Sequence, residues 1–146
     1  MSSNWRPDDS LNERDKKGVL NGEKKIKAAL AKNKVRIAKG VTTSRDRGMA
    51  AVKRDLKKTG MPRGVKSFQI PFVLGGCLWF LSCYEPGTIV PMHAHKLVIF
   101  RIVISGEMKH GRRILKQGDW MYVPAGQPYS IQAVGKETLW VFYGHG

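Results

Sequence analysis

The chain has 146 residues, the length of one domain that buries a single core. It carries 26 Lys and Arg against 11 Asp and Glu, a formal net charge of +15, which is typical of proteins that bind nucleic acid or another acidic surface. No apolar run approaches the roughly 20 residues that a membrane-spanning helix needs, and the polar N-terminus shows no secretory signal, so we expect a cytoplasmic protein outside the membrane.

The positive charge is concentrated in the N-terminal half. Residues 1–68 hold 19 Lys and Arg against 7 Asp and Glu, a net charge of +12. Residues 69–146 hold 7 against 4, a net charge of +3. An electrostatic partner is therefore expected to bind the first half of the chain.

The first 60 residues predict an arm followed by two helices. Residues 1–22 are polar and interrupted by glycine, and we expect little fixed structure there. Residues 23–39 have apolar side chains at helical spacing and end before Gly40, which suits the residue after a helix. A second helix is expected to begin after Thr43 or Ser44 and to stop before Gly60.

From Gly64 onward the pattern changes to short apolar and aromatic runs separated by turn residues. Six such runs in about 80 residues indicate an all-β barrel or sandwich. The runs are VKSFQIPFV, CLWFLSCYE, LVIFRIVISGEM, RRILKQGDWMYV, YSIQAV and TLWVFYG. We place the boundary between Gly60 and Lys66, which gives a basic, partly helical extension over residues 1–64 and a β domain over residues 65–146.

The two cysteines, Cys77 and Cys83, are expected to be buried free thiols. They lie six residues apart on one predicted strand, which separates them by roughly 20 Å, beyond the reach of a disulfide. Free buried thiols are typical of a reducing compartment.

Two glycine-bounded motifs lie in the β domain. The first, G-x5-H-x-H with a later glycine, consists of Gly87, His93, His95 and Gly106. The second, G-x5-P-x-G, consists of Gly118, Pro124 and Gly126. In this order and spacing, residues 87–130 resemble the two conserved motifs of the cupin superfamily. The resemblance implies a small double-stranded β-helix barrel of the jelly-roll type, usually a homodimer, with its active site inside the barrel.

The histidine pair is the first candidate site. Side chains at positions i and i+2 of a strand point to the same face, so His93 and His95 can meet one metal ion or one substrate. The sequence departs from the cupin pattern at the other ligands: Ile99 or Phe100 replaces the glutamate, and Tyr129 replaces the third histidine. The two histidines are therefore expected either to hold one divalent ion weakly (Zn, Fe, Ni or Mn) or to transfer protons without a metal.

Arg101 shares the inward face with the histidines if the alternation continues through Leu97, Ile99 and Val103. An arginine inside a small barrel needs an anion, because an unpaired buried charge is costly. Two readings stay open, a salt bridge to Glu85 or Glu107, and a clamp on a carboxylate or phosphate of a substrate.

Three further side chains lie near the motifs or in the β domain. Tyr129, at the position of the missing histidine, is a candidate for proton donation or substrate contact. His110, in a predicted hairpin turn, and His145, next to the C-terminus, are expected to be solvated.

The basic extension has three explanations. It covers the barrel with an apolar face, or captures nucleic acid or an acidic protein, or helps to close a lid over the barrel mouth.

The leading hypothesis is a small cupin enzyme that acts on a small or carrier- or peptide-tethered anionic substrate. His93, His95 and Tyr129 would be catalytic, Arg101 would bind the substrate, and cyclisation, isomerisation or lyase chemistry is favoured over oxygenation. The alternative is a non-catalytic cupin that binds a small ligand or metal and contacts nucleic acid or an acidic protein through its extension.

Overall fold

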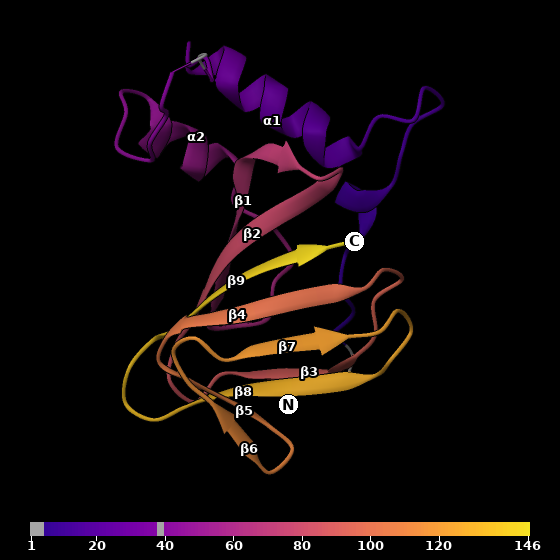
Figure 1. The fold of residues 1–146 in the computed structure, drawn as a ribbon, viewed down its shortest axis with the longest axis vertical. Coiled ribbons are helices and arrows are strands. Elements are labelled where there is room, and N and C mark those ends of the chain that lie inside the picture. The colour runs from indigo at the N-terminus through magenta and orange to yellow at the C-terminus, as the bar shows by residue number, and fades with distance from the viewer. Residues whose placement is uncertain (1–4, 38–39) are drawn as a thin grey trace.

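The computed structural model describes residues 5–37 and 40–146. A 3₁₀ helix, η1 (Ser10–Asn12), and two α-helices, α1 (Asn21–Lys32) and α2 (Met49–Asp55), precede nine strands (Figure 1). The strands are β1 (Val65–Leu74), β2 (Cys77–Tyr84), β3 (Ile89–His93), β4 (Ile99–Ser105), β5 (Glu107–His110), β6 (Arg113–Leu115), β7 (Trp120–Val123), β8 (Tyr129–Val134) and β9 (Leu139–His145). The predicted mostly β architecture with two N-terminal helices is confirmed.

The strands form two antiparallel sheets, which we call the barrel. One sheet has the order β1-β2-β9-β4-β7 and the other the order β3-β8-β5-β6. Non-consecutive strands lie side by side in both sheets, so the chain crosses repeatedly between them (Figure 1). Strand β2 buries every second residue and exposes the others partly, as expected of a strand with one face on a core.

The core lies between the two sheets. It also extends beneath the helices. Its fully buried large side chains come from the five-stranded sheet, from β5 and from α2, and they include Leu78, Phe80, Ile99, Met108, Leu139 and Val52. Burial of such side chains stabilises the fold by roughly 1.5–3 kcal/mol each. The alternation on β4 buries Ile99, Arg101 and Val103, as the sequence predicts, whereas Leu97 lies before the strand and is exposed.

Helix α1 is shorter than expected at its C-terminal end. It ends at Lys32 rather than before Gly40, because the Asn33 side chain bonds the Ala29 carbonyl at 2.8 Å and the Asp55 carboxylate at 2.7 Å, and Lys34 then adopts a left-handed conformation. Residues 38 and 39 of the predicted helix lie outside the described residues.

Helix α2 begins later than expected and is short. Thr43 and Asp46 form a local turn through two hydrogen bonds of 2.8 and 3.1 Å, and Gly48 follows in the left-handed conformation. The helix therefore begins at Met49 instead of after Thr43 or Ser44.

The segment before α1 is ordered where the structure describes it, so the expectation of an arm without fixed structure is wrong for residues 5–22. Leu11 is buried, and Arg14 forms an antiparallel bridge with Leu20. Residues 1–4 of the expected arm lie outside the described residues.

The helices pack against β1, and α1 approaches the five-stranded sheet closely at Gly22. A Cβ atom at this position would lie 2.4 Å from Leu78 Cδ1. Only glycine therefore allows this approach without a shift of the buried leucine.

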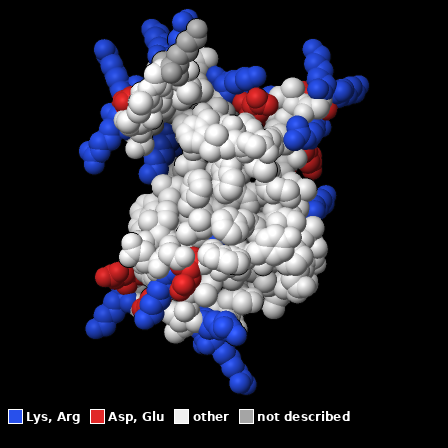
Figure 2. All heavy atoms as spheres, viewed as in Figure 1, with Lys and Arg blue, Asp and Glu red and all other residues white. Residues whose placement is uncertain are grey.

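Charge is distributed unevenly over the surface. Figure 2 shows Lys and Arg side chains gathered around the helical end, and a broad uncharged area over the strands below it. Among residues 5–37 and 40–146, no helix has the length and apolar character needed to cross a membrane.

Cys77 and Cys83 are both free, as predicted, and both lie on β2. They are half-buried rather than buried, because they belong to the strand face that points away from the core.

Candidate functional site

His93 and His95 lie together at one end of the barrel. His93 is the last residue of β3, and His95 lies in the connection to β4. Their ring centroids are 4.9 Å apart. The backbone N–H of Gly126, from the second glycine-bounded motif, donates to the His95 carbonyl at 2.8 Å. The two sequence motifs therefore meet in space, and a backbone hydrogen bond from the second motif holds His95 of the first.

Asp9 and His145 join His95 in one cluster. The Nδ1 atom of His95 lies 2.9 Å from Oδ1 of Asp9, and the His95 and His145 ring centroids are 5.2 Å apart. One potential ligand atom from each of these three residues lies within 4.8 Å of the others. Two imidazoles and one carboxylate are a donor set that zinc and non-haem iron sites use.

His145 is buried, with 4% of its surface exposed, so the prediction that it is solvated is wrong. Strand β9 extends to residue 145 and pairs His145 with Ile99 of β4, which brings the histidine inside the barrel. Its Nδ1 atom is buried and has no hydrogen-bond partner within residues 5–37 and 40–146. His110, in contrast, is exposed as expected.

The environment keeps two of the histidines neutral. Burial lowers the pKa of His93 to about 4 and that of His145 to about 3. Burial is the largest influence on Asp9 and alone would raise its pKa. The hydrogen bond with His95, the electrostatic interactions with His95 and His145 and the bond from the Lys96 backbone together outweigh burial and hold the pKa of this carboxyl below its usual value. At pH 7 the cluster thus presents a carboxylate and at least one neutral imidazole, the forms that ligate metals.

His93 has a defined tautomer. Its Nδ1 atom lies 2.6 Å from the Pro91 carbonyl oxygen. Because a carbonyl oxygen only accepts, Nδ1 carries the proton and Nε2 carries the lone pair. His93 can therefore use Nε2 as a proton acceptor or as a ligand.

Tyr129 and Arg101 form the adjoining polar group. Tyr129 pairs with His93 across β3 and β8, and their ring centroids are 4.5 Å apart. The guanidinium of Arg101 donates to the hydroxyl of Tyr129 at 2.8 Å and to that of Tyr84 at 2.9 Å. It also lies over the ring of Tyr143 at 4.6 Å. The two sheets thus face each other through these groups.

Arg101 has no acidic partner among the described residues, so the predicted salt bridge to Glu85 or Glu107 is wrong. Glu107 pairs with Lys116 at 3.9 Å, and Glu85 is exposed. The Arg101 Nε atom is buried, and the described part of the chain offers it no hydrogen-bond partner. The barrel therefore contains a positively charged guanidinium whose N–H donors do not all form hydrogen bonds.

Burial by itself would lower the pKa of the Arg101 guanidinium, but the oxygens of Tyr129 and Tyr84 raise it, so the group stays charged. Burial raises the pKa of Tyr84 to about 12 and also raises the pKa of Tyr129. Both tyrosines are therefore neutral phenols at pH 7.

Three residues of this group, Tyr84, Tyr143 and Asp9, were not singled out from the sequence, and His145 was expected to be solvated. Tyr143 and His145 share the parity of the buried positions on β9, so the i, i+2 argument applied to β3 finds them as well. Tyr84 follows the buried alternation on β2. Asp9 gives no such signal, because its contact with His95 spans 86 residues.

The fold and this arrangement agree with the comparison to known families. Residues 80–143 match the sequence profile described as the cupin domain. The chain therefore carries a cupin domain, as its two motifs suggested. No curated protein sequence matches this chain.

Several solved structures share the fold at low sequence identity. A chain in the complex of SigE with the anti-sigma ChrR from Rhodobacter sphaeroides matches with a TM-score of 0.55 and 17% identity, over 62% of this chain and 49% of that one. Oxalate oxidase in complex with glycolate matches with a TM-score of 0.51 and 20% identity, over 60% and 53%. KdgF from Halomonas sp. matches with a TM-score of 0.50 and 15% identity, over 56% and 78%.

This chain thus spans about half the length of the ChrR complex chain and of the oxalate oxidase. At such identities the likeness concerns the fold alone, because one fold hosts many activities.

Proposed function

We propose that this chain is a small cupin enzyme that binds one divalent metal ion and acts on a small anionic organic substrate. Asp9, His95 and His145 would hold the ion. Two observations carry this proposal. The Nδ1 atom of His145 is buried and has no protein partner in the described residues, and one ligand atom from each of Asp9, His95 and His145 lies within 4.8 Å of the others. A buried polar atom without a partner costs roughly 1–3 kcal/mol, and ligation would remove that cost.

The ion would be Zn²⁺, Fe²⁺, Ni²⁺ or Mn²⁺, all of which accept imidazole or carboxylate ligands. Once bound, such an ion polarises an oxygen of the substrate or lowers the pKa of a bound water. The earlier hypothesis that His93 and His95 are the ligand pair stays a prediction, and the geometry favours His95 with Asp9 and His145.

Arg101 would fix the anionic group of the substrate. The guanidinium is buried and charged, it uses two of its nitrogens on tyrosine hydroxyls, and its Nε atom lacks a partner in the described chain. A carboxylate or phosphate compensates such a charge better than a phenol does. The oxalate oxidase of the same fold binds glycolate, another small carboxylate.

His93 and Tyr129 would transfer protons. Nε2 of His93 carries a lone pair, and the neutral Tyr129 hydroxyl can donate its proton while Arg101 stabilises the oxygen left behind. Proton abstraction from one atom and proton donation to another are the common steps of isomerisation, elimination and cyclisation. We therefore propose chemistry of this kind.

One observation favours iron-dependent oxygenation as a second candidate. The absence of a carboxylate after His95 argued against it in the sequence, but Asp9 supplies a carboxylate from elsewhere in the chain. Two histidines and one carboxylate are the ligand set of many non-haem iron oxygenases. Dioxygen uptake by the Fe²⁺-loaded protein with small carboxylates would favour this candidate over metal-assisted proton transfer.

The test is metal binding by tag-free protein, first stripped with a chelator and then titrated with each ion by calorimetry and elemental analysis. We expect one equivalent in the wild type and in the exposed control His110→Ala, and loss of binding in His95→Ala and His145→Ala. The variant His93→Ala separates the two ligand hypotheses, because it keeps the metal if His93 transfers protons. Full binding in both His95→Ala and His145→Ala would overturn the proposal.

A further inference from the structure

The N-terminal segment of residues 5–12, which we call the arm, crosses the end of the barrel where the histidines lie. In Figure 1 it descends from η1 past the C-terminal end of β9 toward β3 and β8. The Trp5 ring meets the His93 ring edge-on at 4.9 Å, and Asp9 contacts His95. The arm therefore touches both histidines of the first motif.

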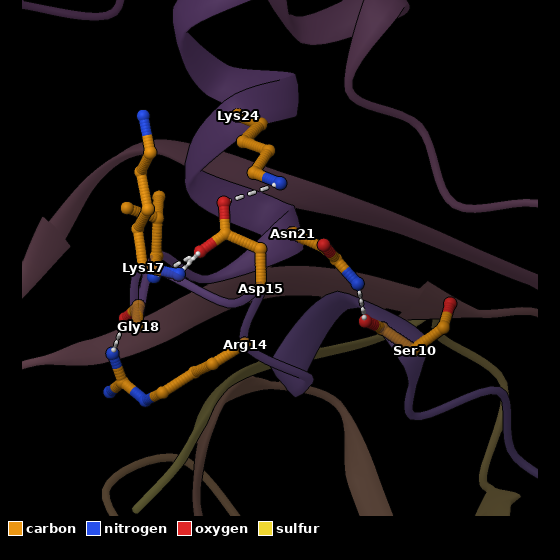
Figure 3. Close-up of polar contacts among 8 residues, drawn as sticks. Ser10, Arg14, Asp15, Lys17, Gly18, Asn21 and Lys24 are labelled. Carbon is orange, nitrogen blue, oxygen red and sulfur yellow. Dashed lines mark hydrogen bonds and ion pairs between the residues drawn. The ribbon is translucent and has the colours of Figure 1, made fainter.

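The arm joins a firmly fixed segment that leads into α1. Figure 3 shows the contacts: Asp15 pairs with Lys24 at 2.7 Å and accepts the backbone N–H of Lys17 at 2.8 Å. Arg14 donates to the Gly18 carbonyl at 2.7 Å. Asn21 donates to the Ser10 carbonyl at 3.0 Å, which fixes the end of η1 to the helix. This network anchors the chain from Ser10 onward.

Residues 5–9 are held differently. Trp5 donates from Nε1 to the Gly60 carbonyl at 2.8 Å, and Asp9 meets His95 at 2.9 Å. Neither residue belongs to a strand or helix. A segment held by a few side chains opens locally at a much lower cost than a paired strand does.

Asp9 is thus a site residue carried by the less firmly held part of the chain. Its Oδ1 atom lies 2.9 Å from Nδ1 of His95, so this part of the chain brings a carboxyl group into direct contact with the site. A cation bound between Asp9, His95 and His145 would tie the arm to two different parts of the barrel, since His95 precedes β4 and His145 ends β9.

We propose that the arm covers the end of the barrel and that Asp9 closes it by binding the metal ion. Metal binding and solvent access to His93 are then coupled. This inference rests on the proposed metal site. With the ion bound, the arm is fixed and Trp5 shields His93; without it, the arm opens more often. The basic extension then contributes an acidic residue to the site.

The test compares hydrogen exchange of the arm with and without Zn²⁺ in the full chain. The variants are Asp9→Asn and the matched control Asp8→Asn, which changes the same charge one residue away and keeps an oxygen for the Ser10 N–H. We expect Zn²⁺ to slow amide exchange in residues 5–12 in the wild type and in Asp8→Asn. In Asp9→Asn this slowing should be lost, and the dissociation constant for Zn²⁺ should rise about 10- to 100-fold.

A second measurement is independent of the ligands. Trp5→Ala should increase the acylation of His93 by diethyl pyrocarbonate several-fold, while Zn²⁺ still binds. Equal Zn²⁺ affinity in Asp9→Asn and the wild type, or arm exchange that Zn²⁺ leaves unchanged, would overturn the coupling and leave the metal site standing. Absence of Zn²⁺ binding in every variant would overturn both proposals.

Discussion

Two regions of the molecule bring side chains to the same site, and they hold them by different means. Arg101 and His145 lie on β4 and β9, central strands of the five-stranded sheet, and Tyr129 lies on β8. Asp9 reaches the cluster from the arm, and its backbone carbonyl accepts a hydrogen bond from the N–H of Asn12 at 3.0 Å. Paired strands fix one set of groups, and individual side-chain contacts fix the other.

The difference teaches where a small barrel can be rigid and where it can move. A residue on a central strand cannot shift without breaking ladder hydrogen bonds on both sides, whereas a residue on a segment such as the arm can leave at little cost. The barrel therefore defines the position of the substrate groups, and the arm is suited to opening and closing.

The largest difference in stability is expected when a buried leucine is replaced by alanine in each region. Leu78→Ala, on β2 beneath α1, should lower the free energy of unfolding by about 3–5 kcal/mol, because rigid neighbours leave a cavity. Leu11→Ala, in η1, should cost less than about 2 kcal/mol, because a three-residue turn at the edge of the core can relax into the space more easily than a paired strand can. Urea unfolding measures both, and equal losses would show that the arm is as rigid as the barrel.

Substitution of glycine in a tight turn between strands should destabilise the fold nearly as much as substitution in the core. Gly106, between β4 and β5, has a φ of 81°, and a Cβ there would lie 2.7 Å from the Thr138 carbonyl oxygen. Gly111 has a φ of 58° and open space around it. Both Gly→Ala variants should cost about 1–3 kcal/mol for the left-handed conformation. Gly106→Ala should cost at least about 1 kcal/mol more, from the clash with backbone atoms.

Thermal and urea unfolding of the two glycine variants provide this comparison. If Gly111→Ala is as destabilising as Gly106→Ala, the close approach to Thr138 is not what fixes this turn.

The smallest effect on stability is expected at Asp15, in the segment that anchors the arm to α1. The hydrogen bond from Lys24 and those from the Val19 and Lys17 backbones lower the pKa of Asp15 from 3.8 to about 2. A carboxyl whose pKa is lowered in the folded state stabilises that state above its ordinary pKa, and this contribution is lost as the pH falls toward the folded value. Asp15→Asn should therefore be slightly less stable than the wild type at pH 6, and the difference should vanish near pH 2.

Melting temperatures measured from pH 6 to pH 2 follow this difference, with Asp46→Asn, an exposed turn carboxylate, as the control for local turn bonds. A loss in Asp15→Asn as large as that in Leu78→Ala would contradict the ranking of the two regions.

Much of the fold could be predicted from the sequence. The strands and the inward direction of Arg101 were predicted from local patterns: the alternation on β2 and β4 and the glycines that separate the apolar runs. Such patterns can be read from the sequence because they depend only on neighbours along the chain. Helix ends were predicted less well, because the Asn33 side chain and the turn at Thr43 stop or delay the helices by local hydrogen bonds.

Within the site, the sequence by itself determined that His93 and His95 lie close together and that Tyr129 and Arg101 belong to the same interior. The two motifs with fixed spacing brought His93, His95 and Tyr129 together, and the two-residue period of a strand directed Arg101 inward. His95 itself lies outside β3, so strand alternation does not explain its position. Only the tertiary structure decided that Tyr84 and Tyr129, rather than a carboxylate, meet Arg101, and that His145 and Asp9 join His95. The arm reaches His95 only because the chain crosses the barrel end, and a contact across 86 residues leaves no periodic trace in the sequence.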